Sequence, residues 1–320
     1  MSVYTTITET ELQRFLADYS VGRLVSYTGI SEGIDNTNYF VQTDQGEFVL
    51  TVFERLSAAE LPYFLDLLEH LHQHQVACAR PIANRQQQFL SQIQHKPAAM
   101  VERLPGTTVK TIQASQCGDI GHALAQLHVA GQHYPQQQYN RRGLDWCQTT
   151  ARALDSVLPS DEAEMVRREL TEQCSLHQSS LDLPTGTIHG DLFHDNVLYD
   201  GLRFSGMIDF YFACHDVLLY DLAVAINDWC KDPAQPERLE PARTQQLLTA
   251  YQSMRPLTAN ESQAFSLLLR RAALSWWLSR LYDKYFPREG ELTLIKDPDV
   301  FKRLLQDRIQ HRAIYQAWVN

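Results

Sequence analysis

The residues with the clearest chemical potential lie near the middle of the chain, between His189 and Phe210. Asp191 precedes Asn196 by five positions, and Asp209 follows Asn196 after thirteen more. Phosphoryl transfer from a nucleoside triphosphate needs a carboxylate that orients the acceptor hydroxyl, together with oxygen ligands for a divalent cation. Two carboxylates and one amide at these positions could supply all of these groups.

The spacing suggests a role for each residue. Protein kinases use H-R-D-x-x-x-x-N followed by Asp-Phe-Gly, and the interval from Asp191 to Asn196 is the same. We therefore expect Asp191 to act as the catalytic base, Asn196 and Asp209 to bind Mg²⁺, and His189 to brace the loop. The alternative is a hydrogen-bonded turn cluster, because Asp, Asn and Gly are common turn residues. The joint pattern favours the catalytic interpretation.

The pattern also resembles a known group of enzymes, the aminoglycoside phosphotransferase and choline kinase superfamily. The residues that carry the resemblance are His189-Gly190-Asp191, Asn196, Ile208-Asp209-Phe210, Leu124 to His128, and Asp216 to Ala223. It implies an α+β, bilobal protein-kinase-like fold with a small antiparallel β-rich N-lobe and a larger, mainly helical C-lobe. Residues 1–103 would form the nucleotide-binding lobe and residues 104–320 the catalytic and substrate lobe, with ATP and Mg²⁺ as cofactors.

Within that superfamily the chain resembles the homoserine kinases of this type. The matching segments are Gly29 to Phe40, Phe48 to Glu54, His189 to Asn196 and Leu274 to Asp283. The resemblance implies transfer of the γ-phosphate of ATP to L-homoserine, which gives O-phospho-L-homoserine in threonine biosynthesis. Two alternatives stay open: a kinase for an aminoglycoside, choline or other amino alcohol, or methylthioribose, and a non-catalytic pseudokinase.

The nucleotide site is expected in the first hundred residues. Gly29 and Gly33 lie between two predicted strands, where backbone N–H groups of a glycine-bearing loop could approach the phosphates. Two glycines alone are more typical of an ordinary hairpin, and only the downstream motif favours the phosphate loop. The fold resemblance places adenine near Met100 to Leu104, against the backbone of Glu102 and Leu104.

One position departs from the general kinase pattern. The third predicted strand has Thr51 where protein kinases carry a lysine that pairs with the phosphates. Arg55 is a candidate replacement cation, although a surface arginine is the commoner reading, and Asp66 or Glu69 could be the partner acid. A second departure is Tyr211 in place of the glycine of Asp-Phe-Gly, which removes a flexible hinge.

Homoserine is a zwitterion, so its site needs a cation for the carboxylate and an acid or amide for the ammonium group. Arg271 and Arg280 lie in an apolar helical segment, where a buried guanidinium needs a partner. A structural salt bridge is an equally good reading of both arginines. Asp35, Asn38 and Tyr211 are further candidates for substrate binding.

The elements that must position these residues follow from periodicity. Residues 8–19 predict a helix that starts with Thr8 and Glu11 in capping-box spacing, and residues 22–27, 39–43 and 48–53 predict an antiparallel meander. A helix is expected over 61–75, and short strands at 89–90 and 98–101. The later chain is mainly helical, and we expect residues 187–189 to pair with 197–199 and a further strand at 204–208 to complete the loops that carry the motif.

Composition sets limits on partners. The formal charge of −10 argues against nucleic acid and anionic membranes as partners. No basic and apolar leader and no uninterrupted apolar stretch of membrane-spanning length is visible, so we expect a cytoplasmic protein. A monomer or homodimer is expected. The six cysteines include no C-x-x-C pair, which favours buried reduced thiols.

Overall fold

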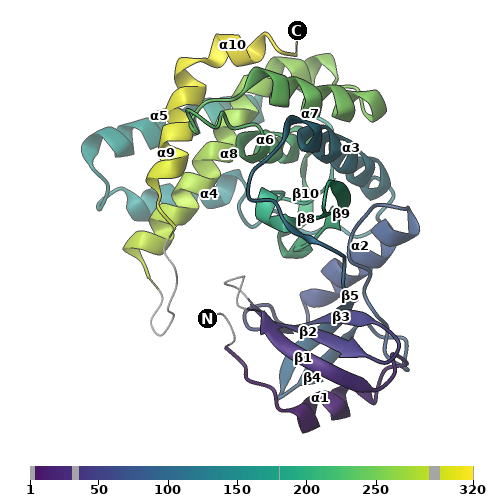
Figure 1. Ribbon diagram of the computed structural model, residues 1–320. Coiled ribbons are helices and arrows are strands. Elements are labelled where there is room, and N and C mark those ends of the chain that lie inside the picture. The colour runs from purple at the N-terminus through teal and green to yellow at the C-terminus, as the bar shows by residue number, and fades with distance from the viewer. Residues whose placement is uncertain (1–3, 31–35, 180, 288–295, 320) are drawn as a thin grey trace. The chain divides into compact units, whose positions relative to one another are not determined.

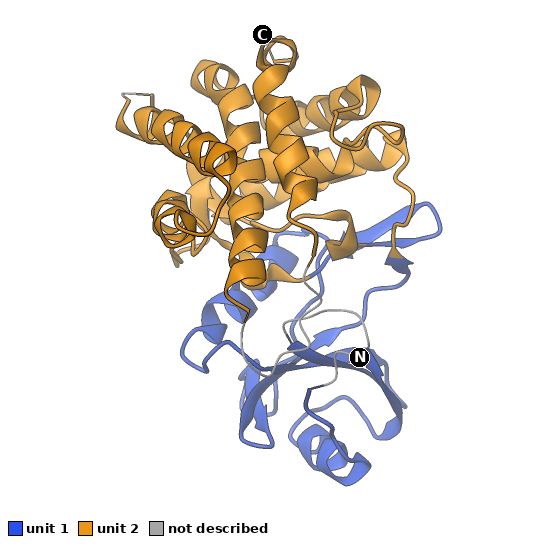
Figure 2. Ribbon diagram, turned by 90° about the vertical axis from the view of Figure 1, so that its left-hand side faces the viewer, with its two compact units in different colours: residues 1–107, 198–208 blue, residues 108–197, 209–320 orange. Residues whose placement is uncertain are grey.

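The computed structural model describes residues 4–30, 36–179, 181–287 and 296–319, and Figure 1 shows their helices and strands. By packing, the chain divides into one unit of residues 1–107 and 198–208 and a second of residues 108–197 and 209–320, coloured separately in Figure 2. The boundary expected between residues 103 and 104 concerns functional lobes and stays a prediction.

The first unit is built on a five-stranded antiparallel sheet in the order β1-β2-β3-β5-β4. The predicted meander is confirmed, and residues 44–46 make the tight turn between β2 and β3, where Thr43 N donates to Gly46 O at 2.9 Å. The strands are β1 (Leu24–Ile30), β2 (Asn36–Thr43), β3 (Glu47–Phe53), β4 (Leu90–Ile93) and β5 (Lys96–Glu102).

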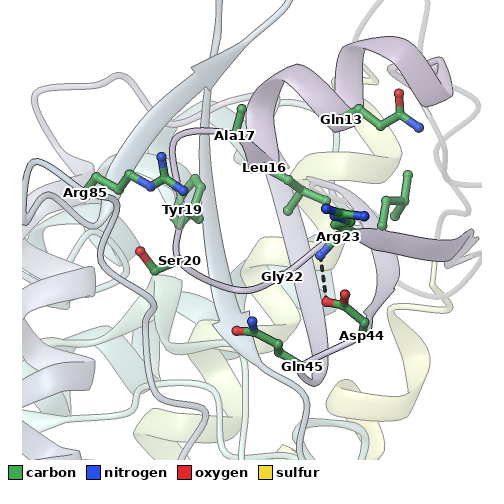
Figure 3. Close-up of a pocket in the computed structure, with 11 residues that line it drawn as sticks. Gln13, Leu16, Ala17, Tyr19, Ser20, Gly22, Arg23, Asp44, Gln45 and Arg85 are labelled. Carbon is green, nitrogen blue, oxygen red and sulfur yellow. Dashed lines mark hydrogen bonds between the residues drawn. The ribbon is translucent and has the colours of Figure 1, made fainter.

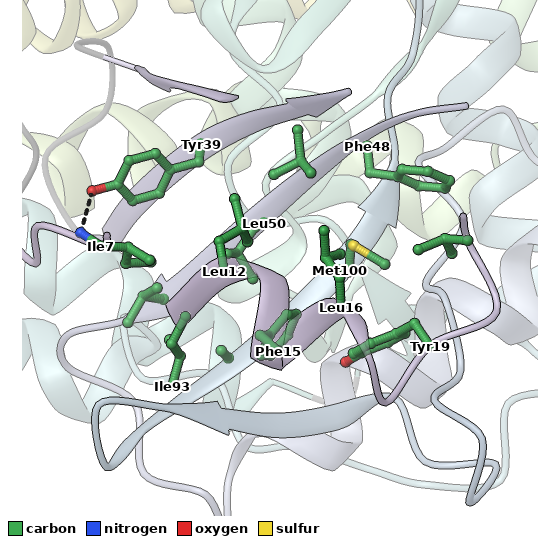
Figure 4. Packing of buried hydrophobic residues seen from close by; sticks show 14 residues of the cluster. Ile7, Leu12, Phe15, Leu16, Tyr19, Tyr39, Phe48, Leu50, Ile93 and Met100 are labelled. Atoms are coloured by element: carbon green, nitrogen blue, oxygen red, sulfur yellow. Dashed lines mark hydrogen bonds between the residues drawn. The ribbon is translucent and has the colours of Figure 1, made fainter. Parts of the chain in front are cut away.

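Helix α1 (Glu9–Leu16) covers one face of this sheet. Its predicted capping box is confirmed, because Thr8 Oγ1 accepts from Glu11 N and Glu11 Oε2 accepts from Thr8 N. Figure 4 shows the resulting core, in which Phe15 and Leu16 of the helix pack with Leu50 and Met100 of the sheet. The predicted second helix is α2 (Leu61–Gln73), which buries seven side chains.

The second unit is mainly helical. Its helices are α3 (Ala114–Gly131), α4 (Leu144–Leu154), α5 (Ser160–Gln178), α6 (Leu218–Trp229), α7 (Pro241–Met254), α8 (Ala259–Tyr285), α9 (Asp299–Gln310) and α10 (Arg312–Gln316). Helices α3 and α7 pack so closely that a Cβ on Gly121 would lie 2.1 Å from Leu247 O. A separate apolar core joins α4, α5, α8 and α9 around Trp277 and Leu278.

Short strands hold the motif segments. They are β6 (Thr107–Thr108), β7 (Thr185–Ile188), β8 (Val197–Asp200), β9 (Arg203–Met207) and β10 (Cys214–Val217), with the turns η1 (His194–Asn196) and η2 (Phe210–Phe212). The expected pairing of residues 187–189 with 197–199 is wrong: β7 pairs with β10, and β8 pairs with β6 and β9. The reason is that the chain turns at Gly190 and that β8 finds its partner β9 two residues later in a local hairpin.

Candidate active site

The segment after β7 turns sharply at Gly190, which has a φ of 76°. A Cβ at this position would lie 2.8 Å from the carbonyl oxygen of Phe212, closer than such contacts allow. Only glycine both adopts this backbone conformation freely and leaves room for the neighbouring segment. The turn therefore brings the loop of Asp191 against the segment that follows Asp209.

Asp221 of helix α6 holds this loop in place. Its carboxylate accepts hydrogen bonds from the backbone N–H of His189 at 2.7 Å and of Gly190 at 2.8 Å. His128 Nε2 of α3 lies 3.2 Å from the same carboxylate, which is fully buried. Burial alone would raise the pKa of Asp221, but the bonds from His128 and the His189 backbone hold it below its usual value.

Sequence reasoning missed this role for Asp221. The available signal was an acidic residue inside α6, a helix whose residues are all buried. An acid in such a helix requires hydrogen-bond donors from elsewhere in the fold. The sequence could not show that the donors are the backbone groups of the motif loop.

Asp191 lies in the buried part of the loop, with 8% of its surface exposed. Asn196 Nδ2 donates to the carbonyl oxygen of Asp191 at 2.8 Å and to its Oδ2 at 3.0 Å. The other carboxylate oxygen, Oδ1, is buried and has no hydrogen-bond partner within the described part of the chain. Because buried polar atoms are almost always satisfied, Oδ1 is the atom left to receive a substrate hydroxyl.

The charge state of Asp191 is sensitive to its surroundings. Burial, and next the negative charge of Asp209, raise its pKa well above the usual value. The positive charge of Arg142 lowers this pKa. A raised pKa suits a general base, which works best when its pKa is close to the working pH.

His189 is fully buried beneath the loop. Its Nδ1 accepts from the backbone N–H of Asp191 at 3.3 Å, and its ring lies 4.5 Å from that of Phe210. These contacts connect the Asp191 loop with the residue that follows Asp209. The bracing role expected for His189 stays a prediction.

Asp209 adopts a left-handed backbone conformation, with φ 61° and ψ 59°, directly before η2. This conformation is uncommon outside glycine and is often retained at functional sites. The side chain is exposed, and the buried ring of Phe210 follows it. The carboxylate of Asp209 is thus exposed, although Phe210 beside it packs in the interior of the unit.

Asn196 and Asp209 fit a hard divalent cation. The amide nitrogen of Asn196 is committed to Asp191, so its carbonyl oxygen is the atom left for a metal ion. No group of three or more His, Cys, Asp or Glu side chains suited to a metal ion occurs in the described residues. Mg²⁺ usually binds one or two protein carboxylates together with substrate phosphates and water.

The predicted nucleotide residues lie in the first unit. Gly29 sits in β1 opposite Tyr39, while Gly33 lies outside the described residues. Thr51 in β3 is buried and donates to Asn38 Oδ1 of β2 at 2.7 Å. The position that carries lysine in protein kinases therefore holds a neutral hydroxyl and amide pair.

Lys96 already has an acidic partner. It forms an ion pair at 2.5 Å with Glu54, which directly follows β3. Side chains alternate between the faces of a strand, so Thr51 lies on the face opposite to Val52, which packs in the core with α1.

The two residues proposed near adenine lie at and after the end of β5. The backbone N–H of Glu102 is already used, since it donates to Arg80 O at 2.8 Å. Leu104 follows the strand and lies close to Gly206, where a Cβ would come 2.8 Å from Leu104 Cδ1. Their role in binding adenine stays a prediction.

The predicted substrate residues have varied surroundings. Arg271 pairs with Asp216 at 2.9 Å and lies 4.8 Å from the centre of the Tyr220 ring. Arg280 donates to Asp297 O at 3.0 Å and covers the Phe301 ring. Both arginines therefore have partners inside the protein. Tyr211 is part of η2, Asn38 is bonded to Thr51, and Asp35 lies outside the described residues.

A different arginine lies beside the Asp191 loop. Arg142 precedes α4, and its guanidinium carbon lies 4.2 Å from the ring centres of both Phe212 and Trp276. Sequence reasoning missed Arg142, because its aromatic neighbours are 70 and 134 positions further along the chain.

A pocket in the first unit is separate from these residues. It has a volume of about 730 Å³ and is lined by residues of α1, β1 and the following turns, among them Tyr19, Arg23, Asp44 and Arg85 (Figure 3). Asp44 Oδ1 accepts from the backbone N–H of Arg23 at 2.7 Å. None of the residues predicted to bind ATP or substrate lines it.

Comparison with known proteins identifies the family. The model of the phosphotransferase enzyme family matches residues 26–257, a range that includes the whole Asp191, Asn196 and Asp209 constellation. The chain belongs to this family. It is thus an ATP-dependent phosphotransferase that acts on a hydroxyl acceptor.

Curated relatives of this phosphotransferase match it over its full length. A homoserine kinase from Methylobacillus flagellatus is 44% identical, and the match covers 100% of this chain and 99% of the relative. A homoserine kinase from Cupriavidus necator is 41% identical, with 97% and 96% covered.

Solved structures of more distant proteins share the fold. A microcompartment-associated aminopropanol kinase superimposes with a TM-score of 0.71 at 17% identity, covering 97% of this chain and 99% of that one. An amicoumacin kinase in complex with AMP-PNP, Ca²⁺ and Ami gives 0.70 at 16% identity, with 96% and 94% covered. The predicted α+β protein-kinase-like fold is confirmed.

No helix of the described residues has the length and apolar character needed to cross a bilayer.

Proposed function

We propose that this phosphotransferase is a homoserine kinase that transfers the γ-phosphoryl group of ATP to the side-chain hydroxyl of L-homoserine. The observation that carries the proposal is the full-length similarity, at 39–44% identity, to curated homoserine kinases. The constellation of Asp191, Asn196 and Asp209 provides the chemical groups that the reaction requires. The product is O-phospho-L-homoserine, an intermediate of threonine biosynthesis.

The proposed mechanism centres on Asp191. Its unsatisfied Oδ1 accepts a hydrogen bond from the homoserine hydroxyl and orients the oxygen toward the γ-phosphorus atom. As the oxygen–phosphorus bond forms and the bond to ADP breaks, the hydroxyl proton passes to Asp191. Asn196 holds the carboxylate at the correct angle through Oδ2, and Asp221 fixes the backbone of the loop.

We expect ATP and Mg²⁺ as cofactors, with the ion held by Asn196 Oδ1 and the carboxylate of Asp209. When bound, the ion neutralises charge on the phosphates of ATP. The protein's own contribution is to keep the Asn196 oxygen available by committing its nitrogen to Asp191. We further expect a cytoplasmic enzyme that is a monomer or homodimer.

A panel of acceptors tests the proposal. ADP release is measured with Mg-ATP and L-homoserine, choline, 3-aminopropan-1-ol, methylthioribose or kanamycin, and the phosphorylated product is identified by ³¹P NMR. The proposal expects the highest kcat/KM with L-homoserine. Turnover of a different acceptor without turnover of L-homoserine would indicate one of the other small-molecule kinases, and binding of ATP without turnover of any acceptor would indicate a pseudokinase.

A further inference from the structure

The guanidinium group of Arg142 contacts two aromatic rings that belong to the surroundings of the catalytic residues. One ring is that of Phe212, three residues after Asp209, and the other is that of Trp276 in α8. The Trp276 ring lies 4.7 Å from that of Phe193, which is two residues after Asp191. Arg142 is therefore next to both segments that carry the reacting groups.

The backbone of Arg142 is fixed before any ligand binds. Its N–H donates to Asn140 Oδ1 at 2.8 Å, and its carbonyl oxygen accepts from Ser275 Oγ at 3.2 Å. Asn140 is itself anchored to Asp216 at 2.6 Å. With two rings packed against it and its backbone held, the guanidinium has little freedom left to lose on binding a ligand.

Arg142 nevertheless lacks an acidic partner. Its Nη1 is buried without a hydrogen-bond partner, and the guanidinium makes no ion pair with any residue that the structure describes. Arg271 and Arg280 differ in this respect, since Asp216 and the carbonyl oxygen of Asp297 satisfy them. A buried, unsatisfied donor on a cation is costly, so its retention beside reacting groups indicates a ligand that completes it.

We infer that Arg142 binds the α-carboxylate of the acceptor amino acid, an inference that rests on the proposed homoserine kinase activity. The two rings pack against the guanidinium, and its unsatisfied Nη1 is left to donate to a planar carboxylate. The interaction would position the hydroxyl at Asp191 and would select an amino acid over an amino alcohol that lacks the carboxylate. Arg142 is thus a specificity-determining residue, and Asp191 remains the base.

The test compares two acceptors that differ by this one group. L-homoserine and 3-aminopropan-1-ol share the hydroxyl, the three-carbon chain and the amine, and only the first carries a carboxylate. Arg142→Met should raise KM for L-homoserine about 100-fold, since a site built for a polar group depends strongly on it. With Arg142→Lys, which keeps the positive charge near Asp191, kcat should change by less than about 5-fold. KM for ATP and the binding of 3-aminopropan-1-ol, measured as substrate or as competitive inhibitor, should stay within about 3-fold of wild type.

Two further variants complete the design. Arg141→Met makes the same change at the exposed neighbouring position and should behave as wild type. Arg142→Lys keeps the positive charge but not the planar set of N–H donors of a guanidinium. It should raise KM for L-homoserine about 10-fold. Thermal unfolding establishes whether each variant is folded. If Arg142→Met does not fold, the KM of Arg142→Lys for L-homoserine tests the inference.

The outcomes separate the possible roles. An equal loss of kcat with both acceptors in Arg142→Lys, which keeps the positive charge near Asp191, would overturn the inference and place Arg142 on the transferred phosphoryl group. An unchanged KM for L-homoserine in a folded Arg142 variant would also overturn it. If the wild-type enzyme does not phosphorylate L-homoserine, the proposed function itself fails and the carboxylate assignment fails with it.

Discussion

Asn196 Nδ2 lies 2.8 Å from the backbone oxygen and 3.0 Å from the carboxylate Oδ2 of Asp191. One amide group thus fixes the candidate base and keeps its oxygen available for a metal ion. We expect both the orientation of the base and the binding of the metal ion to depend on the contact between Asn196 and Asp191.

Replacing Asn196 by alanine should therefore affect both functions at once. We expect kcat to fall about 100-fold or more, because Asp191 loses its orientation, and the Mg²⁺ concentration for half-maximal rate to rise. The measurement is a Mg²⁺ titration of the steady-state rate. Asp195→Asn is the matched control, since Asp195 is exposed and lies 3.7 Å from Lys296, and it should change kcat by less than about 3-fold. Equal effects of the two variants would contradict the role of Asn196.

Asp221→Asn tests the anchor beneath the loop. The amide keeps only one acceptor oxygen, whereas the native carboxylate accepts from both His189 and Gly190. We expect a loss of roughly 2–4 kcal/mol in the free energy of unfolding, as for buried groups left unsatisfied, and a lower kcat in the folded enzyme. Urea denaturation and steady-state kinetics measure the two effects. Wild-type kcat together with wild-type stability would show that Asp221 does not position the loop.

Arg270 of α8 offers an internal comparison for stability. Its Nη2 contacts Glu169 at 2.6 Å and Glu172 at 2.8 Å, but the Glu169 side chain is 3% exposed and that of Glu172 is 49% exposed. Glu169→Ala should destabilise the fold by about 3–5 kcal/mol, because it leaves a buried guanidinium short of a partner. Glu172→Ala should cost less than about 1 kcal/mol. Similar losses in denaturant unfolding for both variants would contradict this difference.

His194 and Asp228 predict a pH-dependent contribution to stability. Nδ1 of His194 lies 2.7 Å from Asp228 Oδ2, and this hydrogen bond raises the pKa of His194, against the effect of burial. A histidine with a raised pKa in the folded state stabilises the fold fully below its unfolded pKa of about 6.5 and loses that contribution as the pH rises through the folded value. The free energy lost on His194→Gln should therefore be larger at about pH 6 than at about pH 9.

A double-mutant cycle isolates this contribution. The Asp228→Asn substitution removes the carboxylate whose hydrogen bond raises the pKa of His194. In this background His194→Gln should therefore change the free energy of unfolding by a similar amount at both pH values. Denaturant unfolding at the two pH values provides the measurement. A loss that is independent of pH in the wild-type background would show that the pair does not contribute in this way.

Local patterns predicted much of the fold. The capping box of Thr8 and Glu11 and the turn at residues 44–46 were predicted correctly because the interactions span only a few residues. The hairpin after Asn196 has the same local character. The pairing of β7 was predicted wrongly, because its partner β10 lies beyond that hairpin and local patterns do not report such a distance.

The candidate site divides in the same way. Asp191, Asn196 and Asp209 could be proposed from spacing alone, because they lie in two short segments joined by a hairpin. Arg142 and Asp221 could not, since each acts on residues 30 or more positions away. Arg271 was proposed from the sequence, but its partner Asp216 is distant along the chain. Only the structure shows that this arginine already forms an ion pair.

The central claim is that Asp191 drives phosphoryl transfer to L-homoserine, and product analysis tests it most directly. Wild-type enzyme and Asp191→Ala are incubated with Mg-ATP and L-homoserine, and O-phosphohomoserine is quantified by ³¹P NMR alongside ATP affinity. We predict one phosphohomoserine per ADP for the wild type and, for the variant, at least about a 1,000-fold lower rate with ATP affinity within about 3-fold. Absence of phosphohomoserine with the wild-type enzyme, or an unchanged rate with Asp191→Ala, would contradict the account.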